Sequence, residues 1–486
     1  MHDATRHLRN SVRICDSYAD KRLGVDVFGW LHWAKFHQLN KLGRVPTADD
    51  IVEACCSRVE LLLEHRAIPV LVFDGAAVPA KAETDARRRA QREEARQAAD
   101  DLRAAGDLAA MNKKLTEALP VTHELARQFR EEVQSRWGAS VEHLVAPYEA
   151  DAQLAALARS GEVDAVVTRD GDFLAYLLPP AVVLFDLTAE GEVDEQRVGD
   201  LLDATLGASP PVDLSSWSYD KWQLACCIAG CDYVESVHGV GFITALRLVD
   251  EHDGDVAAIL QAIEDDPGLG AVPADYEEKL HQAYLTFRYQ TVYDRGTRTT
   301  RPLRPLPEAV VERYGAAPPF LGAPLAPDDA PGVAEGRLNP SPPHYPFGYV
   351  PPPPPPPQPP AQPPVVPPPS PPAPPPPPRS TPPPSPPPPA ALPSPPPPAP
   401  ALAPAPAAPQ PPLAPPLFQV LPPAAPLAAP PAPAAPAPDA VVPRPAKRRR
   451  LESFIPTSPP ALAVSKLLVG AAAVGVGAYV ANSLLG

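Results

Sequence analysis

Seven carboxylates in the first half of the chain lie at the ends of apolar runs, where side chains from different elements can meet. They are Asp26, Asp74, Glu149, Asp151, Asp170, Asp172 and Asp232. Carboxylates gathered in one place repel one another unless a cation neutralises them. Hard oxygen ligands suit Mg²⁺, for which Mn²⁺ can substitute. Two such ions about 4 Å apart activate water and stabilise the leaving oxygen in phosphodiester hydrolysis. The alternative is a set of solvated surface acids.

The elements that must position these acids follow from the hydrophobic pattern. Four apolar runs predict buried strands: LGVDVF (23–28), IPVLVFDG (68–75), VDAVVT (163–168) and AVVLFDL (181–187). Helical patterns separate them, one starting from a Thr47 N-cap and one after Pro147 that begins at Glu149 and Asp151. We therefore expect an α/β fold with a mostly parallel central sheet flanked by helices. Ligands of such sheets bind beyond the carboxyl ends of the strands, where three of the runs place acids.

A basic helix is predicted between residues 81 and 103. It has no apolar stripe, so it should stand away from the core. Its cations are Lys81, Arg87, Arg88, Arg89, Arg92 and Arg96. Arginine and lysine side chains can grip a phosphate backbone and the scissile phosphate, although a charged run is also typical of a solvated helix face.

A second possible phosphate contact lies at Gly239, Val240 and Gly241, a tight turn before a predicted helix over residues 242–249. Backbone N–H groups point outward at a helix start, where a phosphate can sit. A simple loop is the other interpretation of this short pattern.

Composition limits the classes of protein that this chain can belong to. A formal net charge of -15 argues against a protein that coats nucleic acid through bulk charge, so nucleic-acid contacts must come from local basic faces. The six cysteines are Cys15, Cys55, Cys56, Cys226, Cys227 and Cys231. They contain no CxxC pair and no signal peptide precedes them, which predicts reduced thiols in an intracellular protein rather than a disulfide frame or a zinc site.

The last third of the chain has a different composition. Most of the 77 prolines lie after Pro302, which predicts a disordered Pro/Ala-rich linker over about 306–445 with docking sites for polyproline-binding modules. A basic cluster at Lys447 to Arg450, within 446–460, is typical of nuclear import and also suits nucleic acid or anionic lipid. Leu467 to Leu485, within the hydrophobic tail 461–486, has no charge and is long enough for a C-terminal membrane anchor.

Four segments in this order and spacing carry a family resemblance: FDGAAVPAKAETDARRR, LVAPYEADAQLA, VVTRDGDFLAY and AGCDYVESVHGVGFITAL. They closely resemble the flap endonuclease/XPG superfamily of structure-specific 5′ nucleases, and most of all its eukaryotic exonuclease 1 branch. The resemblance implies a PIN-like nuclease domain over 23–305 after an N-terminal segment 1–22. It also implies a helical arch at about 76–122 and a helix–two-turn–helix element at about 222–250.

The resemblance also implies roles for individual residues. The seven acids match the family's metal ligands, and Lys81, Arg88 and Arg89 match arch cations that reach the scissile phosphate. His32 lies where the family places a ring against the terminal nucleotide, although it is equally a residue on the outer face of a helix. The turn Gly239-Val240-Gly241 matches the element that grips the duplex backbone, often with a K⁺ ion held by turn carbonyls.

The chain departs from the family in three places. The N-terminal Met-Gly-Ile-x-Gly-Leu is replaced by MHDATRHLRN. Arg169 stands before Asp170, where the family usually has an acidic residue. The tail lacks the usual partner-docking segments, although Arg448 to Ile455 (RRRLESFI) resembles a sliding-clamp box without its leading Gln.

The function expected from these features is a metal-dependent 5′ exonuclease or flap endonuclease that acts on DNA in repair or replication. A nuclease of the same fold that degrades RNA is one alternative, and an inert membrane-tethered adaptor is another. The basic cluster predicts a nuclear protein, whereas the apolar tail predicts a tail-anchored one.

Overall fold

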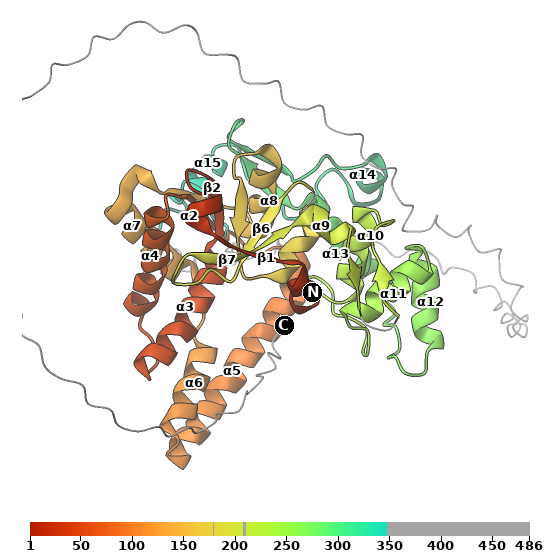
Figure 1. Cartoon of the computed structure of the whole chain (residues 1–486), viewed down its shortest axis with the longest axis horizontal. Helices are drawn as coiled ribbons and strands as arrows, with labels where there is room; N and C mark the ends of the chain where they lie inside the picture. Colours follow the sequence, from red (N-terminus) through yellow and green to blue (C-terminus); the bar gives the residue numbers. More distant parts are fainter. Residues whose placement is uncertain (178, 208–209, 348–486) are drawn as a thin grey trace, which may run out of the picture. The chain divides into compact units, whose positions relative to one another are not determined.

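The computed structural model describes residues 1–177, 179–207 and 210–347. A seven-stranded sheet lies at its centre, with the strand order β1-β7-β6-β5-β2-β3-β4 (Figure 1). The strands are β1 (Asn10–Arg13), β2 (Arg22–Asp26), β3 (Ile68–Phe73), β4 (Glu142–Val145), β5 (Ala165–Val167), β6 (Val182–Phe185) and β7 (Glu192–Arg197). The five strands from β6 to β4 are mutually parallel, and β7 and β1 add antiparallel pairs at one edge. The expected α/β class with a mostly parallel sheet is confirmed.

Helices cover both faces of this sheet because successive strand residues point to opposite sides. Leu71 and Phe73 of β3 pack with α3 (Val27–Leu42), α4 (Ala48–Glu64) and α7 (His123–Trp137). Val70 and Val72 pack on the other face with α8 (Ala150–Ser160) and α10 (Tyr219–Ile228). The predicted N-cap of α4 is confirmed, since the Thr47 side chain accepts from the Asp50 N–H in a capping box.

The basic helix of the arch is α5 (Ala82–Ala105), which turns at Gly106 into α6 (Leu108–Ala118). In Figure 1 this pair projects away from the sheet, as its lack of an apolar stripe predicts. The projection is anchored at one side, because the Lys35 ammonium donates to the Leu119 carbonyl (3.1 Å) and the Asn112 amide to the Gly43 carbonyl (3.1 Å). The arch therefore has a fixed attachment to α3.

The second half of the domain is mainly helical. The elements after β7 are α9 (Val198–Leu202), β8 (Thr205–Leu206), β9 (Val212–Asp213), α10, α11 (Phe242–Glu251), α12 (Val256–Asp265), α13 (Tyr276–Tyr289), β10 (Thr291–Asp294) and β11 (Thr299–Pro302). The turn between α10 and α11 occupies the position expected of the helix–two-turn–helix element. The hairpin β10–β11 follows α13 directly and returns the chain to α8.

The domain is longer at both ends than the sequence predicts. The first 22 residues hold α1 (His2–Thr5), η1 (Arg6–Leu8), β1 and α2 (Ile14–Ser17), and β1 belongs to the central sheet. Residues 306–347 were expected in the linker, but they form α14 (Glu308–Tyr314), η5 (Pro319–Leu321) and α15 (Ala330–Ala334). The linker boundary at 306 is therefore wrong. A few apolar residues, such as Phe320 and Val333, anchor this segment in the core despite its proline content.

In residues 1–177, 179–207 and 210–347, no helix has the length and apolar character needed to cross a bilayer. The predicted anchor Leu467 to Leu485, the basic cluster and the sliding-clamp box lie outside these described residues.

Candidate active site

The predicted acids come together at the carboxyl ends of the parallel strands. Asp26 is the last residue of β2, Asp74 follows β3, and Asp170 and Asp172 follow β5. These three strands are neighbours in the sheet, so their ends lie along one edge. Glu149 and Asp151 reach the same place from the start of α8, and Asp232 comes from the loop after α10. We refer to these seven side chains as the acid cluster: Asp26, Asp74, Glu149, Asp151, Asp170, Asp172 and Asp232.

Burial, and after it repulsion between neighbouring carboxylates, raises the pKa of members of the acid cluster. Burial, and then the charges of Asp26, Asp170, Glu149 and Asp74, raise the pKa of Asp151 well above its usual value. Burial followed by the charge of Asp26 raises the pKa of Asp74 to about 7. The cluster thus holds more negative charge than the nearby protein neutralises, which is the condition that favours a divalent cation.

Backbone and hydroxyl donors fix the orientation of individual acids. Asp26 caps α3 by accepting from the Gly29 N–H (3.0 Å), and its other oxygen accepts from the Thr168 hydroxyl (3.1 Å). A Cβ at position 29 would lie 2.3 Å from that second oxygen, so the position requires glycine. Asp74 accepts from the Ala150 N–H (2.7 Å), which joins the end of β3 to the start of α8. Local turn geometry therefore points these carboxylates toward one volume.

Two cations at the base of the arch contact the acid cluster. The Lys81 ammonium lies 2.6 Å from a Glu149 oxygen and 2.7 Å from an Asp232 oxygen. The Arg88 guanidinium lies 2.8 Å from the other Asp232 oxygen. Burial lowers the pKa of Lys81, but Glu149 and Asp232 outweigh it and raise that pKa well above its usual value. Lys81 and Arg88 therefore both contact the acid cluster, while their contact with the scissile phosphate stays a prediction.

The third predicted arch cation has a different environment. Arg89 is exposed on the surface of α5, whereas its neighbour Arg87 forms an ion pair with Glu235. Helical periodicity accounts for this, because adjacent residues of one helix face different directions. The structure brings Lys81 and Arg88 to the acid cluster, but the Arg89 side chain faces solvent.

Within the described part of the chain, no three Asp, Glu, His or Cys side chains have donor atoms placed for direct coordination of one ion. Lys81 gives a physical reason, since it takes up oxygens of both Glu149 and Asp232. The donor set itself consists of carboxylate oxygens with unbalanced charge, and this suits Mg²⁺ or Mn²⁺.

A network of hydrogen bonds from buried side chains fixes the orientation of the Glu149 carboxylate. Gln290 donates from its side-chain amide to Glu149 Oε2 (3.0 Å), and the Tyr233 hydroxyl donates to the same oxygen. The Tyr176 hydroxyl contacts that of Tyr233. Sequence reasoning missed all three residues. Tyr233 could have been found beside Asp232, but nothing in the sequence distinguishes Gln290, which is fully buried between α13 and β10.

The N-terminal segment, whose sequence differs from that of the family, packs against the loop that carries Asp170 and Asp172. A Cβ at Gly171, between Asp170 and Asp172, would lie 2.8 Å from the His2 Cβ, so the first residues of the chain touch this loop. The Arg169 guanidinium lies 3.9 Å from an Asp186 oxygen, and His2 lies 3.7 Å from that carboxylate. Arg169 precedes Asp170 in the sequence, and its positive charge also interacts with the Asp186 carboxylate.

His32 lies on an exposed part of α3. Partial loss of hydration beside the arch, followed by the positive charges of Lys35, Arg88 and Arg92, lowers the pKa of this ring. These cations place the ring beside the base of the arch. The assignment of His32 to the terminal nucleotide stays a prediction.

The turn before α11 has the geometry of a tight backbone loop. Gly239 has φ +85°, and a Cβ there would also lie 3.0 Å from the Leu269 side chain. Gly241 is the N-cap of α11 and provides no side-chain cap, so the first N–H groups of this helix are left for another acceptor. The Val240 side chain is buried, so only its backbone can contact a ligand. DNA and K⁺ binding at this turn stay predictions.

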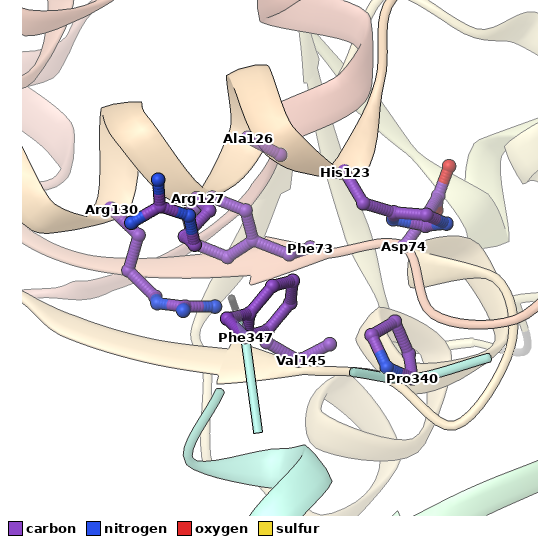
Figure 2. A pocket seen from close by; sticks show the side chains of 9 residues that line it. All are labelled: Phe73, Asp74, His123, Ala126, Arg127, Arg130, Val145, Pro340 and Phe347. Atoms are coloured by element: carbon purple, nitrogen blue, oxygen red, sulfur yellow. The ribbon is translucent and has the colours of Figure 1, made fainter. Parts of the chain in front are cut away.

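A small cavity of about 10 Å³ borders Asp74 on the side of strand β4. Figure 2 shows that β3, α7 and β4 line it together with Pro340 and Phe347 from the last described segment. The Arg130 guanidinium donates to the Gly336 carbonyl (2.7 Å) and lies 5.7 Å from the Phe347 ring. The end of the described chain is therefore fastened beside the acid cluster.

Comparison with known proteins agrees with this arrangement. The XPG N-terminal domain matches residues 5–95, and the XPG I-region matches residues 140–232. The two matches, in this order, contain every member of the acid cluster. This chain belongs to the XPG/flap endonuclease family of nucleases.

Three relatives illustrate the extent of the likeness. Exonuclease 1 of Xenopus laevis is 31% identical over 313 residues, which cover 64% of this chain and 41% of that protein. Exodeoxyribonuclease 1 of Schizosaccharomyces pombe is 31% identical over 326 residues, which cover 67% of this chain and 54% of that protein. This XPG-family chain thus spans about half or less of the length of these relatives. The structure of the Holliday junction-resolving enzyme GEN1 in complex with product DNA and Mg²⁺ is 17% identical, with a TM-score of 0.37 over 58% of this chain and 63% of that one.

Proposed function

We propose that this XPG-family chain is a Mg²⁺-dependent 5′ nuclease that hydrolyses phosphodiester bonds at 5′ ends, flaps and nicks of DNA, in repair or replication. One observation carries the proposal: two cations at the base of the arch, Lys81 and Arg88, contact the acid cluster at the carboxyl edge of the sheet. An inert domain would gain nothing from keeping mutually repelling carboxylates together. The names of the relatives, exonuclease 1 and exodeoxyribonuclease 1, agree with this activity.

The acid cluster would hold the metal ions. When bound, two divalent cations supply an activated water and stabilise the leaving oxygen of the phosphodiester. The protein's part is to keep the oxygen donors oriented: Asp26 through Gly29 and Thr168, Asp74 through the Ala150 N–H. Donors fixed in this way need no reorganisation when the substrate binds.

Lys81 and Arg88 would bind the scissile phosphate. Both cations are held by carboxylates, at 2.6 to 2.8 Å, and a phosphate group offers them a second anionic partner. Exchange of Lys81 from Glu149 and Asp232 to phosphate oxygens would return those carboxylates to the metal site. Substrate binding and completion of the metal site are coupled through this one side chain.

Cleavage assays with the full chain test the proposal. The substrates are 5′-labelled DNA flaps, nicked duplexes and blunt duplexes, together with the matching RNA hybrids, each titrated with Mg²⁺. We expect cleavage of DNA that Asp170→Ala abolishes while DNA binding persists. Faster cleavage of the RNA substrates would favour the RNA nuclease of the same fold, and the absence of Mg²⁺-dependent cleavage on every substrate would favour the inert adaptor.

The C-terminal segments support further proposals on partners and location. The cluster Lys447 to Arg450 would direct nuclear import, and Arg448 to Ile455 would bind a sliding clamp. The alternative, a tail anchor at Leu467 to Leu485, predicts that the expressed protein stays with membranes during carbonate extraction. Release into the supernatant would exclude the anchor. Polyproline-binding modules would dock between these segments and the nuclease domain.

A further inference from the structure

A group of cationic side chains surrounds Asp186, the residue that directly follows β6. Strand β6 is the parallel neighbour of β5, and Asp170 and Asp172 follow β5. Asp186 therefore lies on the same edge of the sheet as the acid cluster, one strand further along. The side chains around it come from the N-terminal segment and from the loop after β5.

The distances around Asp186 are short and similar. The nearest nitrogen atoms lie from its carboxylate at 3.8 Å for Arg6, 4.0 Å for Arg9 and 3.9 Å for Arg169. The His2 ring lies at 3.7 Å. We refer to these five residues as the Asp186 cluster. The three arginines take part in no other ion pair of the described residues, so three guanidinium charges face a single carboxylate. The Asp186 cluster therefore carries an excess of positive charge.

Arg9 is the buried member of the Asp186 cluster, with a side chain that is 1% exposed. Its guanidinium lies 4.0 Å from the centre of the Phe185 ring and donates to the His2 carbonyl (2.8 Å) and to His2 Nε2 (3.2 Å). Because arginine can only donate, Nε2 accepts and Nδ1 carries the ring proton. In the described part of the chain, neither this Nδ1 nor Nε of Arg9 has a hydrogen-bond partner, although both atoms are buried. Buried donors are nearly always paired in native proteins, so these two indicate an acceptor from outside the chain.

The other two arginines are open to solvent. The side chain of Arg6 is 60% exposed and that of Arg169 is 43% exposed, so a ligand can reach both. Each guanidinium has five N–H donors, and its distance to Asp186 is longer than a direct hydrogen bond. These donors are therefore available to an oxyanion, which guanidinium groups bind through pairs of N–H groups.

We propose that the Asp186 cluster binds a phosphate of the nucleic-acid strand that enters the candidate active site. The inference rests on the proposed nuclease function. Carboxylates repel a phosphate backbone, so a strand at the acid cluster needs cations beside it. Lys81 and Arg88 supply them from the arch, and the Asp186 cluster would supply them at the end of β6. The close approach of His2 to Gly171 joins this second group of cations to the loop of the acid cluster.

DNA binding by the full chain in EDTA tests the site without any need for cleavage. Anisotropy of a labelled nicked duplex with a 5′ flap is measured against salt concentration. Arg6→Gln should bind this DNA roughly three- to tenfold more weakly. The slope of log affinity against log salt should become shallower by about one unit, because one phosphate contact is lost.

Arg66→Gln is the matched control. Arg66 is also exposed, at 68%, and it pairs with a single carboxylate, that of Asp20. It precedes β3, so it lies at the end of the strands opposite to the acid cluster. This variant should keep the native DNA affinity and the native salt slope.

Asp186→Asn should change DNA affinity in the opposite direction. Without the carboxylate the arginines have no competing anion, so DNA should bind roughly two- to fivefold more tightly, the size of an exposed charge contact. Asparagine also tolerates the left-handed backbone of Asp186 (φ +51°). If the cluster only fastened the N-terminal segment, Asp186→Asn and Arg6→Gln would both lower the Tm and neither would change DNA affinity.

Three results would overturn the proposal: native DNA affinity and salt slope in Arg6→Gln, an equal loss of affinity in Arg66→Gln, or weaker DNA binding by an Asp186→Asn protein with the native Tm. If Asp186→Asn lowers the Tm, Arg6→Gln decides alone, because its side chain is exposed. Cleavage of the same flap in Mg²⁺ is measured separately. Native cleavage with unchanged binding by Arg6→Gln would refute this site alone, whereas weaker binding by Arg6→Gln without cleavage by the native protein would refute the nuclease activity alone.

Discussion

Replacement of Lys81 by methionine should change metal binding and turnover in opposite directions. The Lys81 ammonium occupies an oxygen of Glu149 at 2.6 Å and an oxygen of Asp232 at 2.7 Å, and all three side chains are no more than 25% exposed. A metal ion that uses either carboxylate must displace this cation. Methionine keeps the length of the side chain but removes the charge.

The expected magnitude follows from the two contacts. Hydrogen bonds to charged groups contribute about 1.5–3 kcal/mol each. A metal ion that binds one of the two carboxylates then competes with one contact fewer. Mg²⁺ binding should therefore tighten by roughly 10- to 100-fold, since 1.4 kcal/mol corresponds to a factor of ten. The same change removes a cation from the scissile phosphate, and loss of one such group costs about 10²- to 10³-fold in turnover.

Two assays measure these effects on the same protein. Isothermal titration with Mg²⁺ in the absence of DNA reports metal affinity, and single-turnover cleavage of a labelled 5′ flap reports the chemical step. Lys21→Met is the matched control, because Lys21 precedes β2, at the end of that strand opposite to Asp26, and pairs with Asp164 (3.3 Å). Unchanged or weaker Mg²⁺ binding by a folded Lys81→Met would refute the competition, and unchanged turnover would refute the phosphate contact.

Three other substitutions follow from the same geometry. Asp172→Ala should abolish metal-dependent cleavage yet leave DNA affinity within about twofold, as measured by anisotropy; cleavage at the native rate would exclude Asp172 from the metal site. Arg88→Ala should lower the single-turnover rate by about 10²-fold and affinity far less, whereas Arg89→Ala, at an exposed position, should have a much smaller effect; equal losses would contradict the placement of Arg88. Gly75→Ala should lower the free energy of unfolding by about 1–3 kcal/mol, because its Cβ would lie 2.0 Å from the Ala146 carbonyl oxygen, while Gly199→Ala meets nothing within 4 Å; denaturant titration of both variants decides the point.

Sequence reasoning located the acid cluster because its members depend on local patterns. Asp26, Asp74 and Asp170 each end an apolar run, and parallel strands bring such ends to one edge of a sheet. Lys81 and Arg88 could be predicted in the same way, because they are cations of a helix without an apolar stripe. The family resemblance added their roles, which the residues alone left open.

The parts that sequence reasoning missed depend on contacts between distant segments. Gln290 meets Glu149 only because α13 and β10 fold against α8, and no local pattern records that contact. Strand β7 (EVDEQR) alternates apolar and charged residues weakly, because it lies near the edge of the sheet and carries the charged residues Glu195 and Arg197. Proline-rich composition concealed the packing of residues 306–347, where a few apolar side chains are enough to fix the segment.

The position of Phe347 has a consequence for everything that binds to the rest of the chain. Phe347 lines the small cavity beside Asp74, so the described chain ends at a point next to the acid cluster. A partner that is covalently connected to its target meets it at an effective concentration that the connection sets. A protein or DNA bound close to this point of the chain would therefore be held near the nuclease site by the covalent chain alone.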